Sequence, residues 1–177
     1  SVHAVENSFS VGASYVSTAG DSTVTIGGGF YQADTTATAA ASDAQSTAMS
    51  ISAVTGNLTV GAGYASGDSF AGETGTAAGS DKELKSASVT TAGAKYVSGD
   101  MTFNVGYANG EAQDEILGTA ADGEADSYEQ TAASVDYAVA SGVTATIGYS
   151  DRARSDEATA DTAHGGTSWY IGANVSF

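Results

Sequence analysis

The sequence has no cysteine and no proline, and it carries only five lysine and arginine residues against 21 aspartate and glutamate residues. Without cysteine, neither a disulfide framework nor a cysteine-ligated metal site can form. Without proline, the turns must be made by glycine, asparagine, aspartate and serine. The formal net charge of −16 excludes an electrostatic footprint for nucleic acid, because nucleic-acid-binding proteins neutralise phosphates with lysine and arginine.

Long apolar runs are also missing. No uninterrupted apolar stretch approaches the roughly 20 residues that a membrane-spanning helix requires. The few leucine and isoleucine residues, the many small residues and the acidity are typical of a soluble or partly disordered chain. The order of the residues contradicts that interpretation, because apolar and small polar residues alternate with a period of two.

Nine segments show this alternation, which places apolar side chains on one face of a strand and polar side chains on the other. The last segment is the clearest, because its odd-numbered residues from Trp169 to Phe177 are all apolar. The alternation predicts strands at roughly residues 7–17, 23–32, 46–55, 58–65, 86–97, 101–108, 128–138, 143–150 and 167–177.

The connections between these segments alternate in length. Short connections that contain turn residues lie at residues 18–21, 55–57, 98–100 and 140–142. Long connections lie between them, at about residues 33–45, 66–85, 108–127 and 151–166. Outer-membrane barrels have short periplasmic turns and long extracellular loops. The sequence therefore predicts an all-β fold, a transmembrane antiparallel up-and-down β-barrel in the bacterial outer membrane.

Aromatic residues lie near the ends of the predicted strands. Tyrosine and tryptophan collect at the two headgroup levels of a bilayer. Tyr15, Tyr96 and Tyr137 come shortly before short turns, which predicts a place at the periplasmic interface. Residues just before long connections are predicted at the outer interface: Phe30, Tyr64, Tyr107 and Tyr149.

The opposite face carries small polar residues, which could not fill a narrow barrel, so a wide, water-filled lumen is expected. Charges in a lumen bias which ions pass, and Lys95 and Asp136 fall on this face. The alternative is that both are solvated wall residues with little effect. The acidic excess favours a mild cation preference. The predicted pore-lining residues are Lys95, Asp136, Asn104, Thr102, Tyr170 and Asn174.

Nine strands do not make an ordinary bacterial barrel, which has an even number and both termini in the periplasm. The last long connection directs the final strand inward, so Phe177 is expected in the periplasm and Ser1 on the extracellular side. Ser1 is neither Met nor the start of a signal peptide. Residues 1–177 are therefore expected to be the C-terminal part of one barrel domain with about seven further N-terminal strands.

The last nine residues, from Trp169 to Phe177, resemble the terminal strand of the Gram-negative general diffusion porins, which are sixteen-stranded. The acidic, alanine- and glycine-rich composition is most similar to alphaproteobacterial members. The resemblance implies a homotrimer of water-filled pores and a terminal strand that the barrel-assembly machinery recognises. The residues to which this role carries over are Trp169, Ile171, Ala173, Val175 and Phe177.

In the general diffusion porins, a loop that folds inward narrows the pore, and a cluster of arginines lies on the opposite wall. Both influence which ions pass, and the loop belongs to the N-terminal half of the barrel. No arginine falls within any predicted strand here, so the arginine cluster is expected upstream or absent. The acidic long connections are expected to form a charged rim that binds divalent cations loosely and bridges to lipopolysaccharide. Weak calcium candidates are Asp122, Glu124 and Asp126, with no other cofactor expected.

The sequence thus predicts an outer-membrane porin for passive diffusion of ions and small polar solutes. One alternative is a non-transporting barrel that displays adhesive or receptor loops, and a secreted acidic β-solenoid would need a short repeat that the sequence lacks. An enzyme is not expected, because His164 and the acidic and hydroxyl residues near it show no base-orienting pattern.

Overall fold

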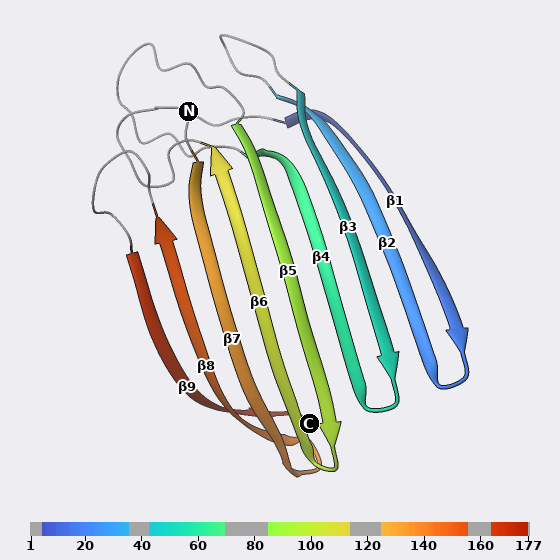
Figure 1. Ribbon diagram of the computed structural model, residues 1–177, viewed down its shortest axis with the longest axis vertical. Helices are drawn as coiled ribbons and strands as arrows, with labels where there is room; N and C mark the ends of the chain where they lie inside the picture. Colours follow the sequence, from blue (N-terminus) through green and yellow to red (C-terminus); the bar gives the residue numbers. More distant parts are fainter. Residues whose placement is uncertain (1–4, 36–42, 70–84, 114–124, 156–163, 177) are drawn as a thin grey trace.

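The computed structural model describes residues 5–35, 43–69, 85–113, 125–155 and 164–176. These residues form one antiparallel sheet in which every strand pairs with its neighbours in sequence (Figure 1). The predicted count of nine up-and-down strands is confirmed. The strands are β1 (Val5–Ala19), β2 (Ser22–Thr35), β3 (Asp43–Thr55), β4 (Leu58–Ser69), β5 (Lys85–Ser98), β6 (Met101–Gln113), β7 (Ala125–Ala140), β8 (Val143–Ser155) and β9 (His164–Val175). The described part of the chain holds no helix long and apolar enough to cross a membrane.

Tight turns join the strands at one end of the sheet. Each of the four two-residue connections contains one glycine with a positive φ, between 52° and 75°. Glycine adopts a positive φ without a Cβ penalty, which suits it to these tight turns. The turn glycines are Gly20, Gly56, Gly99 and Gly142.

Several strands run further toward the long-connection end than the alternation predicts. β8 ends at Ser155 where the sequence indicates residue 150, and its ladder with β7 continues through Arg152 and Arg154. The expectation that no arginine lies within a strand is therefore wrong. The residues after Ser150 are mostly polar on both faces, so the apolar alternation ends there while the backbone pairing continues.

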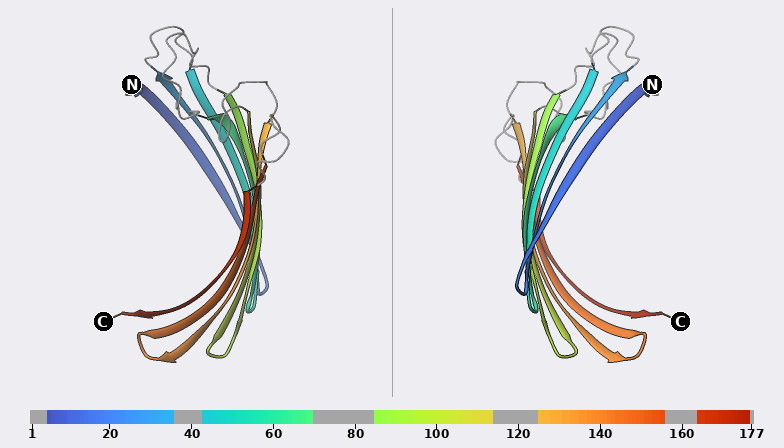
Figure 2. Two further views of the ribbon diagram at one scale, coloured as in Figure 1. Left: turned by 90° about the vertical axis from the view of Figure 1, so that its left-hand side faces the viewer. Right: turned by 90° about the vertical axis from the view of Figure 1, so that its right-hand side faces the viewer.

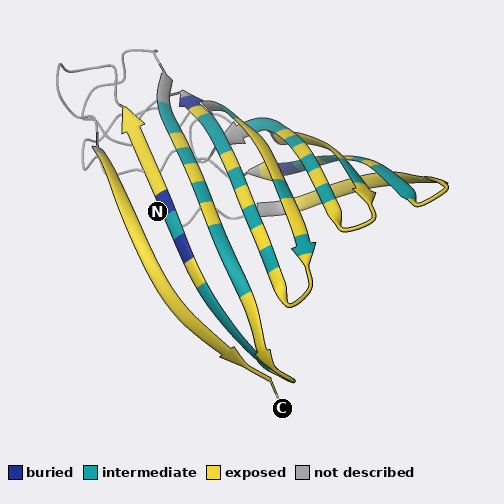
Figure 3. Cartoon of the chain, turned by 60° about the horizontal axis from the view of Figure 1, so that its bottom comes forward, coloured by how far each residue is buried: buried dark blue, intermediate teal, exposed yellow. Residues whose placement is uncertain are grey.

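The two faces of the sheet differ in chemistry, and along β4 and β6 they also differ in exposure. Along β6 the apolar Phe103, Val105 and Tyr107 are exposed, whereas Thr102 and Asn104 are half-buried. Exposed and half-buried residues alternate in the same way along β4, and the bands are visible in Figure 3. Figure 2 shows that the sheet is bowed, with the outer end of β1 and the C-terminal end of β9 curving to the same side.

The described residues contain almost no buried core. The buried apolar side chains are three alanines, Ala33, Ala44 and Ala112, and no large side chain is fully buried. Large apolar side chains are exposed instead, with Trp169 at 72% and Ile171 at 85% of their surface. A soluble domain buries such residues, so the exposed apolar face requires an apolar solvent such as lipid.

Backbone register provides a reference line across the sheet, perpendicular to the strands, against which the positions of the aromatic residues can be compared. One ladder of paired residues crosses all nine strands: Ala19, Ser22, Thr55, Leu58, Tyr96, Phe103, Val135, Ile147 and Ile171. The distance from this ladder to the outer aromatic residue falls across the sheet: ten residues to Phe9, eight to Phe30, six to Tyr64, four to Tyr107, two to Tyr149 and two to Trp169.

The inner aromatic residues slope in parallel with the outer ones. Tyr15 lies four residues outward of the ladder on β1, Tyr96 lies on it in β5, and Tyr137 lies two residues inward on β7. Both belts therefore descend by an average of one residue per strand. One residue of about 3.3 Å against a strand spacing of about 4.8 Å corresponds to a strand tilt of about 35°. Membrane barrels tilt their strands by about 35–45°, so the aromatic belts lie level in a bilayer when the strands have the tilt of a barrel.

Both edges of the sheet are open. Within the described ranges, β1 pairs only with β2 and β9 pairs only with β8. An exposed edge strand presents a row of unpaired N–H and C=O groups, and these cannot be left unsatisfied in lipid. The nine strands are thus an open part of a barrel whose edges need further pairing.

Candidate functional site

The polar face of the sheet carries the candidate site. One ladder on this face joins Lys95, Asn104, Ser134, Gly148 and Tyr170 across β5 to β9. The next ladder toward the tight turns joins Thr102, Asp136, Thr146 and Gly172, and the one after it contains Asn174. All six residues predicted from sequence to line the pore share this face, and their contact with a water-filled lumen stays a prediction.

A hydrogen-bond network holds Asp136 against the wall. The Nδ2 of Asn104 donates to one Asp136 carboxylate oxygen at 2.9 Å and to Ser134 Oγ at 3.1 Å. Thr146 Oγ1 donates to the other carboxylate oxygen at 2.6 Å. Both donors to the carboxylate are neutral, so they fix its position without cancelling its charge. The network gives the wall a fixed negative charge at Asp136.

Lys95 contributes a charge of opposite sign on the same face. It pairs directly with Asn104, the residue that donates to Asp136, so one strand, β6, lies between the two charged residues. The Lys95 side chain is exposed. The wall around Asn104 therefore holds one positive and one negative charge and carries no net charge.

Tyr170 lies across Gly148, its partner on β8. A Cβ added at Gly148 would overlap with the phenol ring, and the nearest ring atom would be Cζ, flanked by Oη and Cε1. A Cβ position that is closest to Cζ and almost as close to the two atoms bonded to Cζ lies above the plane of the ring. The face of the Tyr170 ring therefore covers Gly148. Gly148 is buried although no side chain projects from it, while 49% of the Tyr170 surface remains exposed.

A second polar cluster on this face lies nearer the long-connection end, and the sequence did not reveal it. Tyr128 donates from its hydroxyl to the amide oxygen of Gln130, and the Gln130 amide nitrogen donates to Ser150 at 3.2 Å. The guanidinium carbon of Arg154 lies 5.5 Å from the centroid of the Tyr128 ring, within cation–π range. Arg152 pairs with Gln130 on the same face. The sequence indicates this cluster only when β8 is extended past Ser150, because alternate residues 150, 152 and 154 then lie on the same face as Gln130.

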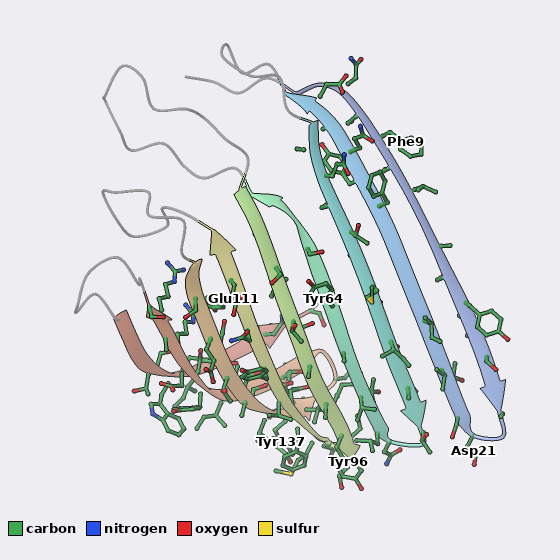
Figure 4. The ribbon with its side chains drawn as sticks, turned by 45° about the horizontal axis from the view of Figure 1, so that its top comes forward. Phe9, Asp21, Tyr64, Tyr96, Glu111 and Tyr137 are labelled. Carbon is green, nitrogen blue, oxygen red and sulfur yellow. The ribbon has the colours of Figure 1, made fainter. Side chains whose placement is uncertain are left out.

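The aromatic residues predicted at the membrane interfaces all lie on the apolar face. Figure 4 shows Tyr96 and Tyr137 at the tight-turn end and Tyr64 nearer the other end of the sheet. At the outer belt, the ring centroids of Tyr149 and Trp169 are 4.8 Å apart in a tilted arrangement. Of the residues predicted as the assembly signal, Trp169, Ile171, Ala173 and Val175 line the apolar face of β9, and Phe177 lies outside the described residues.

The metal candidates are only partly covered by the structure. Asp122 and Glu124 lie outside the described residues, and Asp126 belongs to β7 without a described side chain. Among the described residues, no three histidine, aspartate or glutamate side chains gather in a way that could hold a metal ion. Loosely bound calcium at the rim therefore stays a prediction.

Comparison with solved structures returns outer-membrane proteins. The chain superimposes on OccK10 (OpdN) of Pseudomonas aeruginosa with a TM-score of 0.64 and 12% identity, over 96% of this chain and 53% of that one. For the anion-selective porin of Comamonas acidovorans the TM-score is 0.58 and the identity 14%, over 94% and 47% of the two chains. For OmpT, an outer-membrane protein of Vibrio cholerae, the TM-score is 0.55 and the identity 17%, over 95% and 56%. The chain thus spans about half the length of the structures that it matches.

The match to a family model agrees with the fold. No curated protein matches the chain. The family model described as Gram-negative porin matches residues 2–177, which is nearly the whole sequence. Together with the tilted aromatic belts and the exposed apolar face, this match shows that the chain belongs to the Gram-negative porin family of the bacterial outer membrane.

Proposed function

We propose that the chain forms part of the wall of a diffusion channel for ions and small polar solutes. The observation that carries this proposal is the pairing of an exposed apolar face with an opposite face of mostly small polar side chains, some of them hydrogen-bonded to one another. A closed barrel of about sixteen strands, tilted by about 35° and spaced by about 4.8 Å, has a backbone radius of about 15 Å. Glycine, serine and threonine side chains cannot fill that interior, so water occupies it.

The alternative of a non-transporting barrel that displays adhesive or receptor loops has no observation in its favour. Such a barrel needs a filled or plugged interior. The family indicates a channel rather than an enzyme, and we propose that the chain has no catalytic activity of its own.

The proposed channel is tested by single-channel recording with the complete barrel that contains this chain, purified in detergent and inserted into a planar bilayer. Stepwise openings of high conductance with weak ion selectivity are expected, since a water-filled lumen of this width leaves ions hydrated. Insertion is verified independently by the shift in gel mobility on heating. Folded, inserted protein that gives no openings would contradict the channel.

Ion selectivity is expected to respond in opposite directions to the two charges on the wall. Asp136→Asn leaves Lys95 unopposed and should shift the reversal potential toward anions, whereas Lys95→Gln should shift it toward cations. Two unit charges about 10 Å apart in water interact by about 0.4 kcal/mol. Removing a wall charge changes the energies of a passing cation and a passing anion by this amount in opposite directions, so each variant should change the cation-to-anion permeability ratio about fourfold. The measurement uses a gradient at about 10 mM salt, because the screening length at 0.1 M is only about 10 Å.

The two variants control for each other, because both remove one charge from the same part of the wall. Equal shifts in the same direction, or no shift in either variant, would show that these residues do not face the conducting path. Lys95→Gln leaves Asn104 and Thr146 unchanged, so the Asp136 carboxylate keeps its hydrogen bonds and its position in that variant.

The partners of the chain follow from the same proposal. Outer-membrane lipid contacts the apolar face, and lipopolysaccharide contacts the acidic rim through divalent cations such as loosely bound calcium. Further strands of the same barrel pair with the open edges of β1 and β9, to a total of about sixteen. The complete barrel assembles as a homotrimer, and the barrel-assembly machinery binds the terminal strand.

A further inference from the structure

We infer that Tyr170, Ser134, Asn104 and Asp136 form a weak binding subsite for neutral pyranose sugars on the lumen wall. The inference rests on the proposed channel, since it names a solute class that would touch this part of the wall.

The Tyr170 ring is fixed with one face against the wall. Its Cζ end lies over Gly148, which pairs with Tyr170 on one side and with Ser134 on the other. A ring that covers a glycine with one face presents its other face away from the sheet, and half of the Tyr170 surface is exposed. The open face is electron-rich and flat, which suits the C–H groups on one side of a pyranose ring.

Hydrogen-bonding groups lie next to the end of this platform. Ser134 is the direct neighbour of Gly148, and Asp136 is its diagonal neighbour, at a cross-strand distance of about 7–8 Å between backbone positions. Each Asp136 oxygen accepts one bond from a neutral donor and retains a second lone pair. Both amide hydrogens of Asn104 are directed to Ser134 and Asp136, which leaves its amide oxygen as a further acceptor. Acceptors beside hydroxyl groups match the vicinal hydroxyls of a sugar.

The charges of the wall favour a neutral solute over an ion. Asp136 alone would attract an organic ammonium ion to the ring of Tyr170, because carboxylates and aromatic faces both bind cations. Lys95, across Asn104, opposes that attraction and can itself donate to a hydroxyl. An anion meets the fixed carboxylate of Asp136 in the same place. A polyhydroxylated neutral ring is therefore the solute class that all of these groups accept.

The test adds glucose or maltose to single channels of the complete barrel in a planar bilayer and records the reversible, concentration-dependent fall in current. Mannitol at the same concentration is the solute control, because it has hydroxyls and a comparable effect on viscosity but no rigid ring. We expect glucose and maltose to reduce the current clearly more than mannitol does. Equal effects of all three solutes, or stronger block by tetraethylammonium than by glucose, would overturn the subsite.

Two variants remove the platform by different routes. Tyr170→Leu deletes the ring, and Gly148→Ala displaces it while every polar group of the subsite is kept. Each should weaken the sugar block about tenfold, as expected for the loss of one aromatic stacking surface. Tyr170→Phe keeps the ring and should lose little. Tyr31→Leu alters another tyrosine of the same face, on β2, and should leave the block unchanged.

Measuring salt conductance without sugar distinguishes failure of the sugar subsite from failure of the proposed channel. Parent channels that conduct salt but show no pyranose-specific block would refute the subsite and leave the channel intact. Parent protein that inserts without conducting refutes the proposed function itself. Unchanged block in both Tyr170→Leu and Gly148→Ala, each with normal salt conductance, would likewise refute the role of Tyr170.

Discussion

Ile51→Arg is expected to destabilise the barrel by about 2–4 kcal/mol, the cost of an arginine on the lipid face near the bilayer centre. Ile51 lies on the apolar face of β3 between Ile26 and Ala62, and 49% of its surface is exposed. That exposure would be harmless in water, so the cost arises only if lipid covers this face. The measurement is the free energy of unfolding of the complete barrel in lipid vesicles, from urea titrations.

The neighbouring residue provides the matched control. Ser52 follows Ile51 on β3 and lies on the opposite, polar face, paired with Thr25 and Gly61. Ser52→Arg places the same guanidinium in the lumen, where water solvates it, so the expected change is within about 0.5 kcal/mol. Equal costs for the two variants, or a larger cost for Ser52→Arg, would mean that the lipid and lumen faces are wrongly assigned.

Gly142→Ala is expected to destabilise the barrel by at least about 2 kcal/mol, because two penalties coincide at this turn. Gly142 has a φ of 75°, a conformation that costs an L-residue about 1–2 kcal/mol. A Cβ there would also overlap with the carbonyl oxygen of Ser176. The carbonyl oxygen of Gly142 accepts the backbone N–H of Ser176 at 2.8 Å, so the displaced turn would also loosen the end of β9.

Gly20→Ala isolates the first of these penalties. Gly20 has a φ of 60° in the turn between β1 and β2, and an added Cβ would meet no atom within 4 Å. Its cost should therefore stay at about 1–2 kcal/mol. The two variants are compared by their unfolding midpoints in the same vesicles. Identical losses of stability would show that the contact between Gly142 and the end of β9 carries no weight in the membrane.

The sequence predicted the strands through two regularities that need no tertiary information. Period-two alternation assigns side chains to faces because successive residues of a strand point to opposite sides. The strict alternation of short and long connections gives the antiparallel meander, and the structure has that strand order. The same logic failed after Ser150, because beyond the bilayer both faces of a strand are polar and the alternation disappears. Arg152 and Arg154 were missed for this reason.

Register and side-chain contacts could not be derived from the sequence. The strand tilt follows from the pairing of residues far apart in the chain, such as Thr55 with Ser22 and Leu58 with Tyr96. The network at Asp136 joins residues of three strands, at separations of 10 to 32 residues. A pattern within one strand contains no information on which residue lies opposite on the next.

By itself the sequence determined the class of fold, the two faces and the membrane that they require, because these depend only on the period and polarity of local segments. The tertiary structure decided the rest: the slope of the aromatic belts, the hydrogen bonds that fix Asp136, and the position of the Tyr170 ring over Gly148. These features depend on cross-strand register, which is set by backbone pairing summed over the whole sheet.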